Sequence, residues 1–260
     1  MLLGIDHLVI AVPDLATAQR QYEALGFTVV PGGRHPVGTH NALVAFADGS
    51  YLELIAFYEP NPRHKWWEPL QRGGGLVDFC LRTDDLGADT AAFRRAGVEI
   101  DDPSPLSRVR PDGYQLKWVL SIPRGAARGV APFLIEDQTP REERVPRQHR
   151  HPNGTVGIAA VTVAVDDLAR VRSWYEGALG RPAEDIRRED LDGAGFRVRV
   201  GPHTFDIVAP QSPRSPLREW LDRRGASPYA ATLRTTADRR GPLDPTLTLG
   251  ARLALVPEAP

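Results

Sequence analysis

The sequence contains very little cysteine and lysine. Its 260 residues include one cysteine, Cys80, and lysine only at Lys65 and Lys117, so its 32 basic residues are almost all arginine. A single cysteine excludes an intrachain disulfide and any zinc site built from several cysteines. The formal net charge of −1 lacks the positive excess with which proteins bind nucleic acid or anionic membranes, so we expect neither as a partner.

Long apolar runs are missing as well. No stretch approaches the roughly 18 apolar residues of a membrane-spanning helix. The apolar start of the chain is interrupted by Asp6 and His7 and lacks the basic residues of an export signal. The glycine-rich dinucleotide fingerprint, the P-loop and the G-x-S-x-G elbow do not occur either. These absences predict a cytoplasmic protein.

An internal repeat is the clearest positive feature. The stretch GIDHLVIAVPDL at residues 4–15 returns in outline as GLVDFCLRTDDL at 75–86 and as GIAAVTVAVDDL at 157–168. In each copy a strand-like run is followed by an aspartate that is placed to cap a helix with an apolar stripe. The copies differ at one position of the strand, which is in turn His7, Asp78 and Ala160.

Each copy continues with further strand patterns, so the chain predicts an α+β protein built from tandem βαβββ modules. Three modules are full, and a shortened fourth has a helix at 216–225 and strands at 229–236 and 251–257. We expect an N-terminal domain at 1–140 with modules at 1–58 and 75–137, a linker at 141–153 rich in proline and charge, and a C-terminal half at 154–260.

These modules, with Asp-His in the first strand and YLELIAF as the fourth, resemble the vicinal oxygen chelate superfamily and more closely its glyoxalase-like branch. The superfamily includes glyoxalase I, extradiol dioxygenases and bleomycin-resistance proteins. The resemblance also covers LGFTVVPGGRHPVGTHNALVAF, YQLKWVL, PFLIED and HPNGTVGIAAVTVAVDDL, and it weakens after Pro210. It implies that paired modules form cupped mixed sheets. It also implies a divalent metal ion held by matching positions on the first and fourth strands of each module.

His7 and Glu53 match the two metal-ligand positions of the first module. The residues agree with this, because Glu53 lies in an apolar strand between Leu52 and Leu54, where a carboxylate is seldom buried without a partner. An inward histidine and glutamate would share a divalent ion. Without metal, the same two side chains would form a His–Glu hydrogen bond. Glu53 is also the candidate catalytic base.

Asp78 matches the first-strand ligand position of the second module. A set of His7, Glu53 and Asp78 is rich in oxygen and suits Mn²⁺ or Mg²⁺ better than iron, although Fe²⁺ and Zn²⁺ stay open. The competing interpretation is an ion pair between Asp78 and Arg82, four residues along the same strand face. For the fourth ligand the sequence leaves two options, Glu136 or none.

The third module lacks these residues. Its first strand has Ala160 at the ligand position, and Asp206 is the counterpart of Glu53 but has no histidine partner. We therefore expect the C-terminal half to be degenerate and to hold no metal-ligand set.

Four further residues are candidates for substrate binding. Thr39 and Asn41 end a glycine-rich loop that we expect at the mouth of the cup, although such residues also stabilise ordinary turns. Arg82 would bind a carboxylate or enolate oxygen. Trp118 would form a cavity wall or part of the core.

Two functions compete at this point. The first is a metal-dependent lyase, isomerase or dioxygenase that acts on a small oxygen-rich molecule. The second is a metal-free protein that binds or sequesters a small molecule, as bleomycin-resistance proteins do. As partners we expect this small molecule and, at most, a second copy of the chain.

Overall fold

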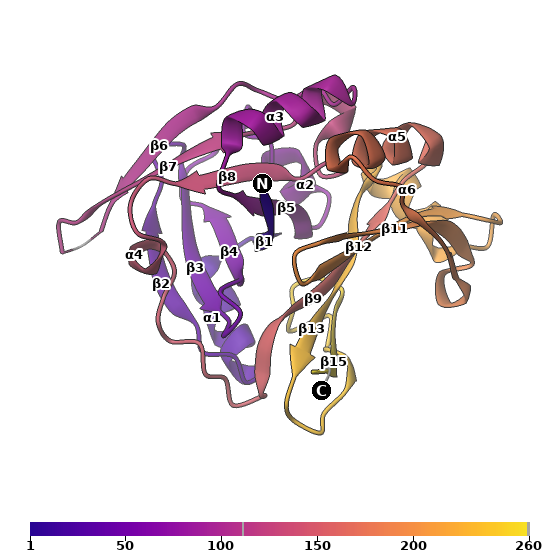
Figure 1. The fold of residues 1–260 in the computed structure, drawn as a ribbon. Helices are drawn as coiled ribbons and strands as arrows, with labels where there is room; N and C mark the ends of the chain where they lie inside the picture. The colour runs from indigo at the N-terminus through magenta and orange to yellow at the C-terminus, as the bar shows by residue number, and fades with distance from the viewer. Residues whose placement is uncertain (111, 259–260) are drawn as a thin grey trace.

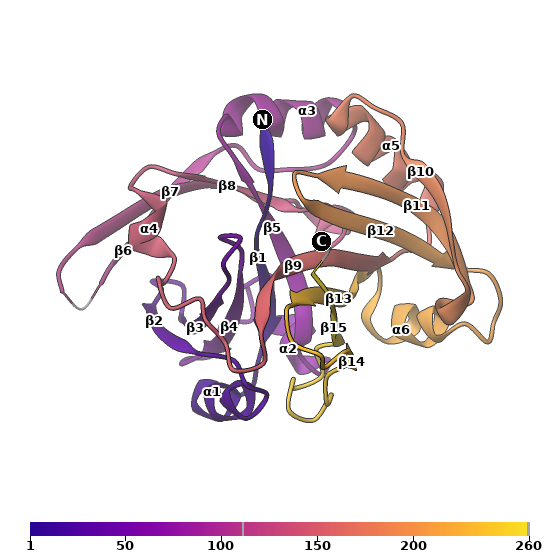
Figure 2. The same ribbon diagram turned by 60° about the horizontal axis from the view of Figure 1, so that its bottom comes forward.

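Two mixed β-sheets pack back to back in the computed structural model, which describes residues 1–110 and 112–258 (Figures 1 and 2). The first sheet has eight strands and the second has seven. Helices α3 and α5, one from each half, lie side by side at one end of the junction (Figure 1). This is the α+β architecture of tandem βαβββ modules that the sequence predicts.

The first sheet joins two modules along β1 and β5, which pair antiparallel, in the order β2-β3-β4-β1-β5-β8-β7-β6. Its strands are β1 (Leu2–Ala11), β2 (Val30–Arg34), β3 (Thr39–Ala45), β4 (Tyr51–Phe57), β5 (Gly75–Thr83), β6 (Ser104–Val109), β7 (Gln115–Ser121) and β8 (Phe133–Asp137). The helices of this half are α1 (Leu15–Ala24), α2 (Trp67–Gln71), α3 (Leu86–Arg95), the 3₁₀ turn η1 (Gly125–Ala127) and α4 (Arg141–Arg144).

The second sheet repeats this arrangement in the order β10-β11-β12-β9-β13-β15-β14. Its strands are β9 (Thr155–Ala164), β10 (Glu184–Arg188), β11 (Gly193–Val200), β12 (His203–Pro210), β13 (Ser227–Thr235), β14 (Gly241–Pro242) and β15 (Leu253–Pro257). The helices of this half are α5 (Leu168–Leu179), the 3₁₀ turn η2 (Glu189–Leu191) and α6 (Pro216–Arg224).

Helix α6 does not occupy the place of a module helix. It precedes β13 and packs Leu217, Trp220 and Leu221 against Ala164 and Val208 on the second sheet. Helix α6 therefore covers the end of this face at which β9 and β12 finish.

The three repeated aspartates cap their helices as expected. The side chains of Asp14, Asp85 and Asp167 each accept a hydrogen bond from the backbone N–H three residues further on. An N-cap of this kind stabilises a helix by about 1 kcal/mol.

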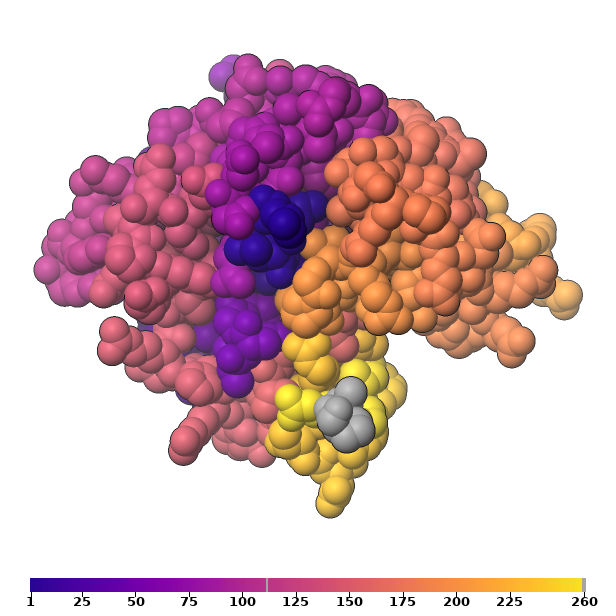
Figure 3. All heavy atoms as spheres, viewed as in Figure 1, coloured from indigo at the N-terminus to yellow at the C-terminus, as the bar shows by residue number. Residues whose placement is uncertain are grey.

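The main core lies between the backs of the two sheets and contains residues of both. Phe79 of β5 and Phe205 of β12 meet there with ring centroids 5.6 Å apart. The approach is close at the start of the chain, because a Cβ on Gly201 would lie 2.2 Å from the carbonyl oxygen of Leu3. Figure 3 shows the N-terminal residues, in indigo, where the two halves meet.

In the described ranges, the structure contains no helix that combines the length and the apolar character needed to span a membrane.

Replacing Phe79 with alanine tests the packing of the two halves. Phe79 is completely buried, so we expect Phe79→Ala to lower the free energy of unfolding by about 3–5 kcal/mol through lost contacts and a cavity. Urea denaturation followed by circular dichroism measures this loss. The exposed Val109→Ala serves as control and should change stability by less than about 0.5 kcal/mol. Equal effects of the two variants would contradict the packing described here.

Candidate functional site

The concave face of the first sheet, called here the first cup, has its own apolar lining, separate from the main core. The lining is formed by residues of β1, β4, β5 and β8, with Trp66 from the segment before α2. His7 and Glu53 lie on this face as well. Val9 and Ile55, each two residues further along the same strand, belong to the lining, and side chains two residues apart in a strand share a face.

His7 and Glu53 meet inside the first cup. The His7 Nε2 atom lies 3.5 Å from Glu53 Oε2, and both side chains are at least nine-tenths buried. The His7 ring stacks on Tyr51, with centroids 4.7 Å apart, and meets the edge of Phe133. The two side chains that the sequence singled out are therefore close enough to touch a common ligand atom.

A bulge in β1 brings Asp6 to the same place. Against β5, the pairing steps from Ile5–Leu81 to His7–Cys80, so Asp6 is an extra residue in its strand. Bulges interrupt the alternation of side chains. Asp6 Oδ1 consequently lies 2.6 Å from His7 Nδ1, which strict alternation would have ruled out. Sequence reasoning missed this contact.

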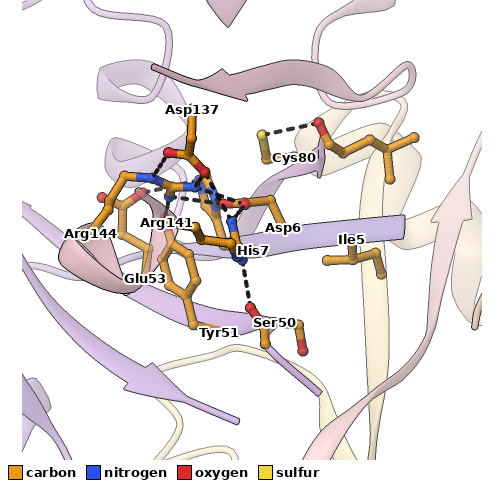
Figure 4. A network of polar contacts seen from close by, with 12 residues as sticks. Ile5, Asp6, His7, Ser50, Tyr51, Glu53, Cys80, Asp137, Arg141 and Arg144 are labelled. Atoms are coloured by element: carbon orange, nitrogen blue, oxygen red, sulfur yellow. Dashed lines mark hydrogen bonds and ion pairs between the residues drawn. The ribbon is translucent and has the colours of Figure 1, made fainter. Parts of the chain in front are cut away.

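Two arginines hold Asp6 in its ionised form (Figure 4). Asp6 is fully buried, and burial works to raise the pKa of its carboxyl group. The positive charges of Arg144 and Arg141, together with the hydrogen bond from His7, outweigh burial and hold this pKa well below its usual value. The ionised carboxylate accepts the proton of His7 Nδ1, so Nε2 is the nitrogen that faces Glu53.

Arg144 comes from the segment expected to be only a linker. Its guanidinium binds Asp137 through two hydrogen bonds of 2.5 and 2.8 Å, Asp6 at 2.9 Å, and the Tyr51 hydroxyl at 2.8 Å. Helix α4 is thus fastened to the rim of the first cup by buried ion pairs. Such contacts across 138 residues of chain leave no local sequence pattern.

Asn41 orients Glu53. The Asn41 side-chain amide donates a 2.6 Å hydrogen bond to Glu53 Oε1, and its oxygen accepts from the backbone N–H of Gly33 at 2.9 Å. Thr39 is also buried, and its hydroxyl lies 2.9 Å from His35 Nδ1. These two residues, expected to bind substrate, therefore support the site from β3.

Asp78 has different partners from both sequence interpretations. It lies 2.9 Å from Lys65 Nζ and accepts hydrogen bonds from the Trp66 indole and the Phe79 backbone. The expected alternative, a pair with Arg82, does not form. The ammonium group of Lys65 therefore neutralises the Asp78 carboxylate. The same group lies 3.9 Å from the centre of the Phe133 ring.

Glu136 does not reach the first cup. Its carboxylate accepts a 2.7 Å hydrogen bond from the backbone N–H of Leu86 at the start of α3, on the opposite face of the sheet. The neighbouring Ile135 takes the inward position of β8. The prediction of Glu136 as a fourth ligand is therefore wrong. Because Ile135 faces the cup, alternation along β8 points Glu136 to the other face of the sheet.

The remaining candidates, Arg82 and Trp118, are half-buried. Burial lowers the pKa of Arg82, whose Nε has no hydrogen-bond partner in the part of the chain that the structure describes. Trp118 packs against the apolar lining of the first cup.

Three side chains of the first cup escaped the sequence analysis as site residues. Burial, assisted by the charge of Lys65, lowers the pKa of His64 to about 4, and burial also lowers that of His35. Both histidines are therefore neutral near pH 7. The third residue is Arg108, on which the charge of Glu53 acts. The histidine and lysine next to Trp66 in RHKWWEPL were the available signal.

The donor atoms do not add up to a complete divalent-metal site. Among described residues, Asp6, His7 and Cys80 are the group whose ligand atoms lie within 4.8 Å of one another. Asp6 is already bound by two arginines, and burial raises the pKa of the Cys80 thiol, so it stays protonated and is a poor ligand. His7 and Glu53 alone offer two ligands, whereas catalytic metal sites commonly use three.

The second half has no comparable cluster at the matching positions. Asp206 is bound by Arg197 at 2.7 Å and by Arg188 at 3.3 Å, and Arg188 also donates to Thr162. With α6 on the same face, these contacts satisfy the carboxylate within the protein.

Residues 5–179 match the family described as the glyoxalase-like domain. The chain belongs to this family. Its fold is that of the vicinal oxygen chelate superfamily, as the sequence indicated. No curated protein sequence matches the chain at a significant level.

Solved structures share the fold at low sequence identity. A hypothetical protein from Staphylococcus aureus is 16% identical, with a TM-score of 0.74 over 99% of this chain and 100% of that one. A mutant 4-hydroxymandelate synthase from Streptomyces coelicolor is 18% identical, with a TM-score of 0.61 over 91% and 72%. A fusion of a xylose isomerase-like TIM barrel with 4-hydroxyphenylpyruvate dioxygenase is 16% identical, with a TM-score of 0.57 over 92% and 37%.

The Asp6 network predicts an acid-sensitive fold. Because the pKa of Asp6 is lower in the folded than in the unfolded state, its stabilising effect is complete above the ordinary value of 3.8 and is lost as pH falls through the folded pKa. We expect Asp6→Asn to lower stability at pH 7 by about 3–5 kcal/mol, and the difference from wild type to shrink below pH 4.

Urea denaturation at a series of pH values measures this effect. The exposed Asp102, which pairs with Arg94, provides the control, and Asp102→Asn should cost less than about 1 kcal/mol. A difference between wild type and Asp6→Asn that is constant from pH 7 to pH 2 would contradict the ionised state of Asp6.

Proposed function

We propose that this glyoxalase-like protein is an enzyme of lyase or isomerase type that moves a proton on a small oxygen-rich molecule in its first cup. The observation that carries the proposal is the buried pair of His7 and Glu53, with Asp6 behind the histidine. A histidine and a carboxylate held within reach of one atom are suited to acid–base catalysis.

Each residue has a distinct role in this proposal. Glu53, oriented by Asn41, takes a proton from a carbon next to a carbonyl group. In its protonated form, His7 donates the proton of Nε2 to the oxygen on which negative charge develops, while Asp6 holds Nδ1 and orients the ring. His64 and His35, neutral near pH 7, add polarity to the site without adding charge.

A hollow at the rim of the first cup is the entrance that we propose for the substrate. This hollow has a volume of about 380 Å³ and is lined by His35 and Arg108, among other residues. His7 and Glu53 lie beyond this lining, but the charge of Glu53 acts on both His35 and Arg108, which supports an approach to the pair past these two residues.

Hydrogen exchange tests the proposed chemistry before the physiological substrate is known. We expect the wild-type protein to catalyse deuterium uptake from D₂O at the carbon next to the carbonyl group of one or more 2-oxo acids, observed by proton NMR. Glu53→Gln should slow this exchange about 10²–10⁴-fold, because the base is lost while the shape is kept. The exposed Glu59→Gln is the matched control and should leave the rate unchanged. Equal rates in wild type and Glu53→Gln would overturn the proposal.

A metal-dependent version of the same function needs a further ligand beside His7 and Glu53. Asp78 would provide one only by leaving Lys65 and Trp66. We therefore expect protein purified without chelator to contain far less than one Mn, Fe, Zn or Mg ion per chain, measured by elemental analysis, and His7→Ala to contain no less. One ion per chain in the wild type that His7→Ala loses would instead support the metal-dependent enzyme.

The aromatic lining favours a second candidate, a protein that binds a small molecule without catalysis. The ring centroids of Trp66 and Phe133 lie 6.2 Å apart, and Phe57 packs against the same lining. Binding of the oxo acids without any exchange above the solution rate would support this alternative.

A further inference from the structure

Arg108 is a charged side chain that reaches from the rim into the first cup. Strand β6 is exposed along nearly its whole length, and Arg108 is its one half-buried residue. Its Nε and Nη1 atoms are inaccessible to solvent and have no hydrogen-bond partner in the described part of the chain. Burial lowers the pKa of this guanidinium, and the opposing influence of Tyr51 and Glu53 does not restore it.

The backbone opposite makes room for this side chain. A Cβ on Gly33 would lie 2.9 Å from Arg108 Nη1, which is closer than real Cβ contacts, so an alanine in β2 would displace the arginine. The backbone N–H of Gly33 binds Asn41, which in turn binds Glu53. Arg108 therefore lies against β2, the neighbour of strand β3, which carries the Asn41 that orients the proposed base.

The hollow beside Arg108 is lined by basic and neutral side chains, and the acidic Glu53 lies beyond this lining. The 380 Å³ hollow is lined by Arg34, His35, Tyr58, Ser107 and Arg108, together with the apolar Pro36 and Val109, and no carboxylate belongs to this lining. Arg34 lies over the Tyr58 ring at 4.9 Å rather than against an acidic residue. Two buried guanidinium nitrogens without partners in the described chain are unfavourable, so a ligand that accepts their hydrogen bonds would stabilise the arrangement.

We propose that Arg108 binds a carboxylate group of the substrate and thereby selects small carboxylic acids for the first cup. The planar fork of a guanidinium matches the two oxygens of a carboxylate, which a lysine or a polar neutral residue does not. This inference rests on the proposed function, because it names the substrate class of the same site.

Calorimetric titration tests the binding step with pyruvate and oxalate as probes and acetone as the neutral comparison. We expect both carboxylates to bind the wild type and acetone not to bind. Arg108→Met should weaken carboxylate binding at least about 10-fold, since a charge-assisted hydrogen bond is lost. Arg34→Gln removes an exposed charge from the same hollow and should weaken binding by much less. Equal losses in the two variants, or no carboxylate binding in the wild type, would overturn the proposal.

Thermal unfolding separates a binding role from a structural one. Because Arg108→Met replaces a half-buried charge, whose Nε and Nη1 atoms have no partner among the described residues, with an apolar side chain, we expect the melting temperature without ligand to rise. A lower melting temperature would mean that Arg108 supports the fold, and it would overturn the proposal.

Glu53→Gln keeps this test distinct from that of the proposed function. We expect this variant to retain carboxylate binding while it loses hydrogen exchange, and Arg108→Met to lose binding. Binding that depends on Arg108 without any exchange would retain the carboxylate site and reject the enzyme. Exchange that does not depend on Arg108 would retain the enzyme and reject the carboxylate site.

Discussion

The buried ion pairs between Asp6 and the two arginines of α4 are the interaction on which the candidate site depends. Asp6 has no access to water, so its charge is tolerable only because Arg141 and Arg144 lie against it. The same carboxylate fixes the ring of His7 and directs Nε2 toward Glu53. One network therefore fastens α4 to the sheet and sets the geometry of the acid–base pair.

The two halves of the chain use the same sheet order for different purposes. In the first half the concave face keeps charged and polar side chains, with a hollow at its rim. In the second half α6 covers one end of the concave face, and Asp206 is neutralised by Arg197 and Arg188. The second sheet instead provides the back surface on which the first sheet packs. A duplicated fold can thus retain one site while its copy serves stability.

The fold was predictable because its signals are local. Each copy of the repeat spans about a dozen consecutive residues and contains both the alternating apolar residues of a strand and the aspartate that caps the next helix. The sheet follows from the pairing of these copies. The site was predictable only in part. The meeting of His7 with Glu53 was expected from the resemblance to the superfamily, and strand alternation agreed with it, whereas the partner of Asp78 depends on a loop whose path the pattern does not determine.

The sequence by itself determined the modules, their helix caps and which residue types face the first cup, because these depend on neighbours within a few positions along the chain. The tertiary structure decided what those residues contact. A single bulge turned Asp6 toward His7, and α4 returned from more than 130 residues away to neutralise it. Lys65 paired with Asp78, and β6 placed Arg108 at the rim, where its Nε and Nη1 atoms have no hydrogen-bond partner among the described residues. Charges pair through space, and the distances that decide their partners exist only once the chain is folded.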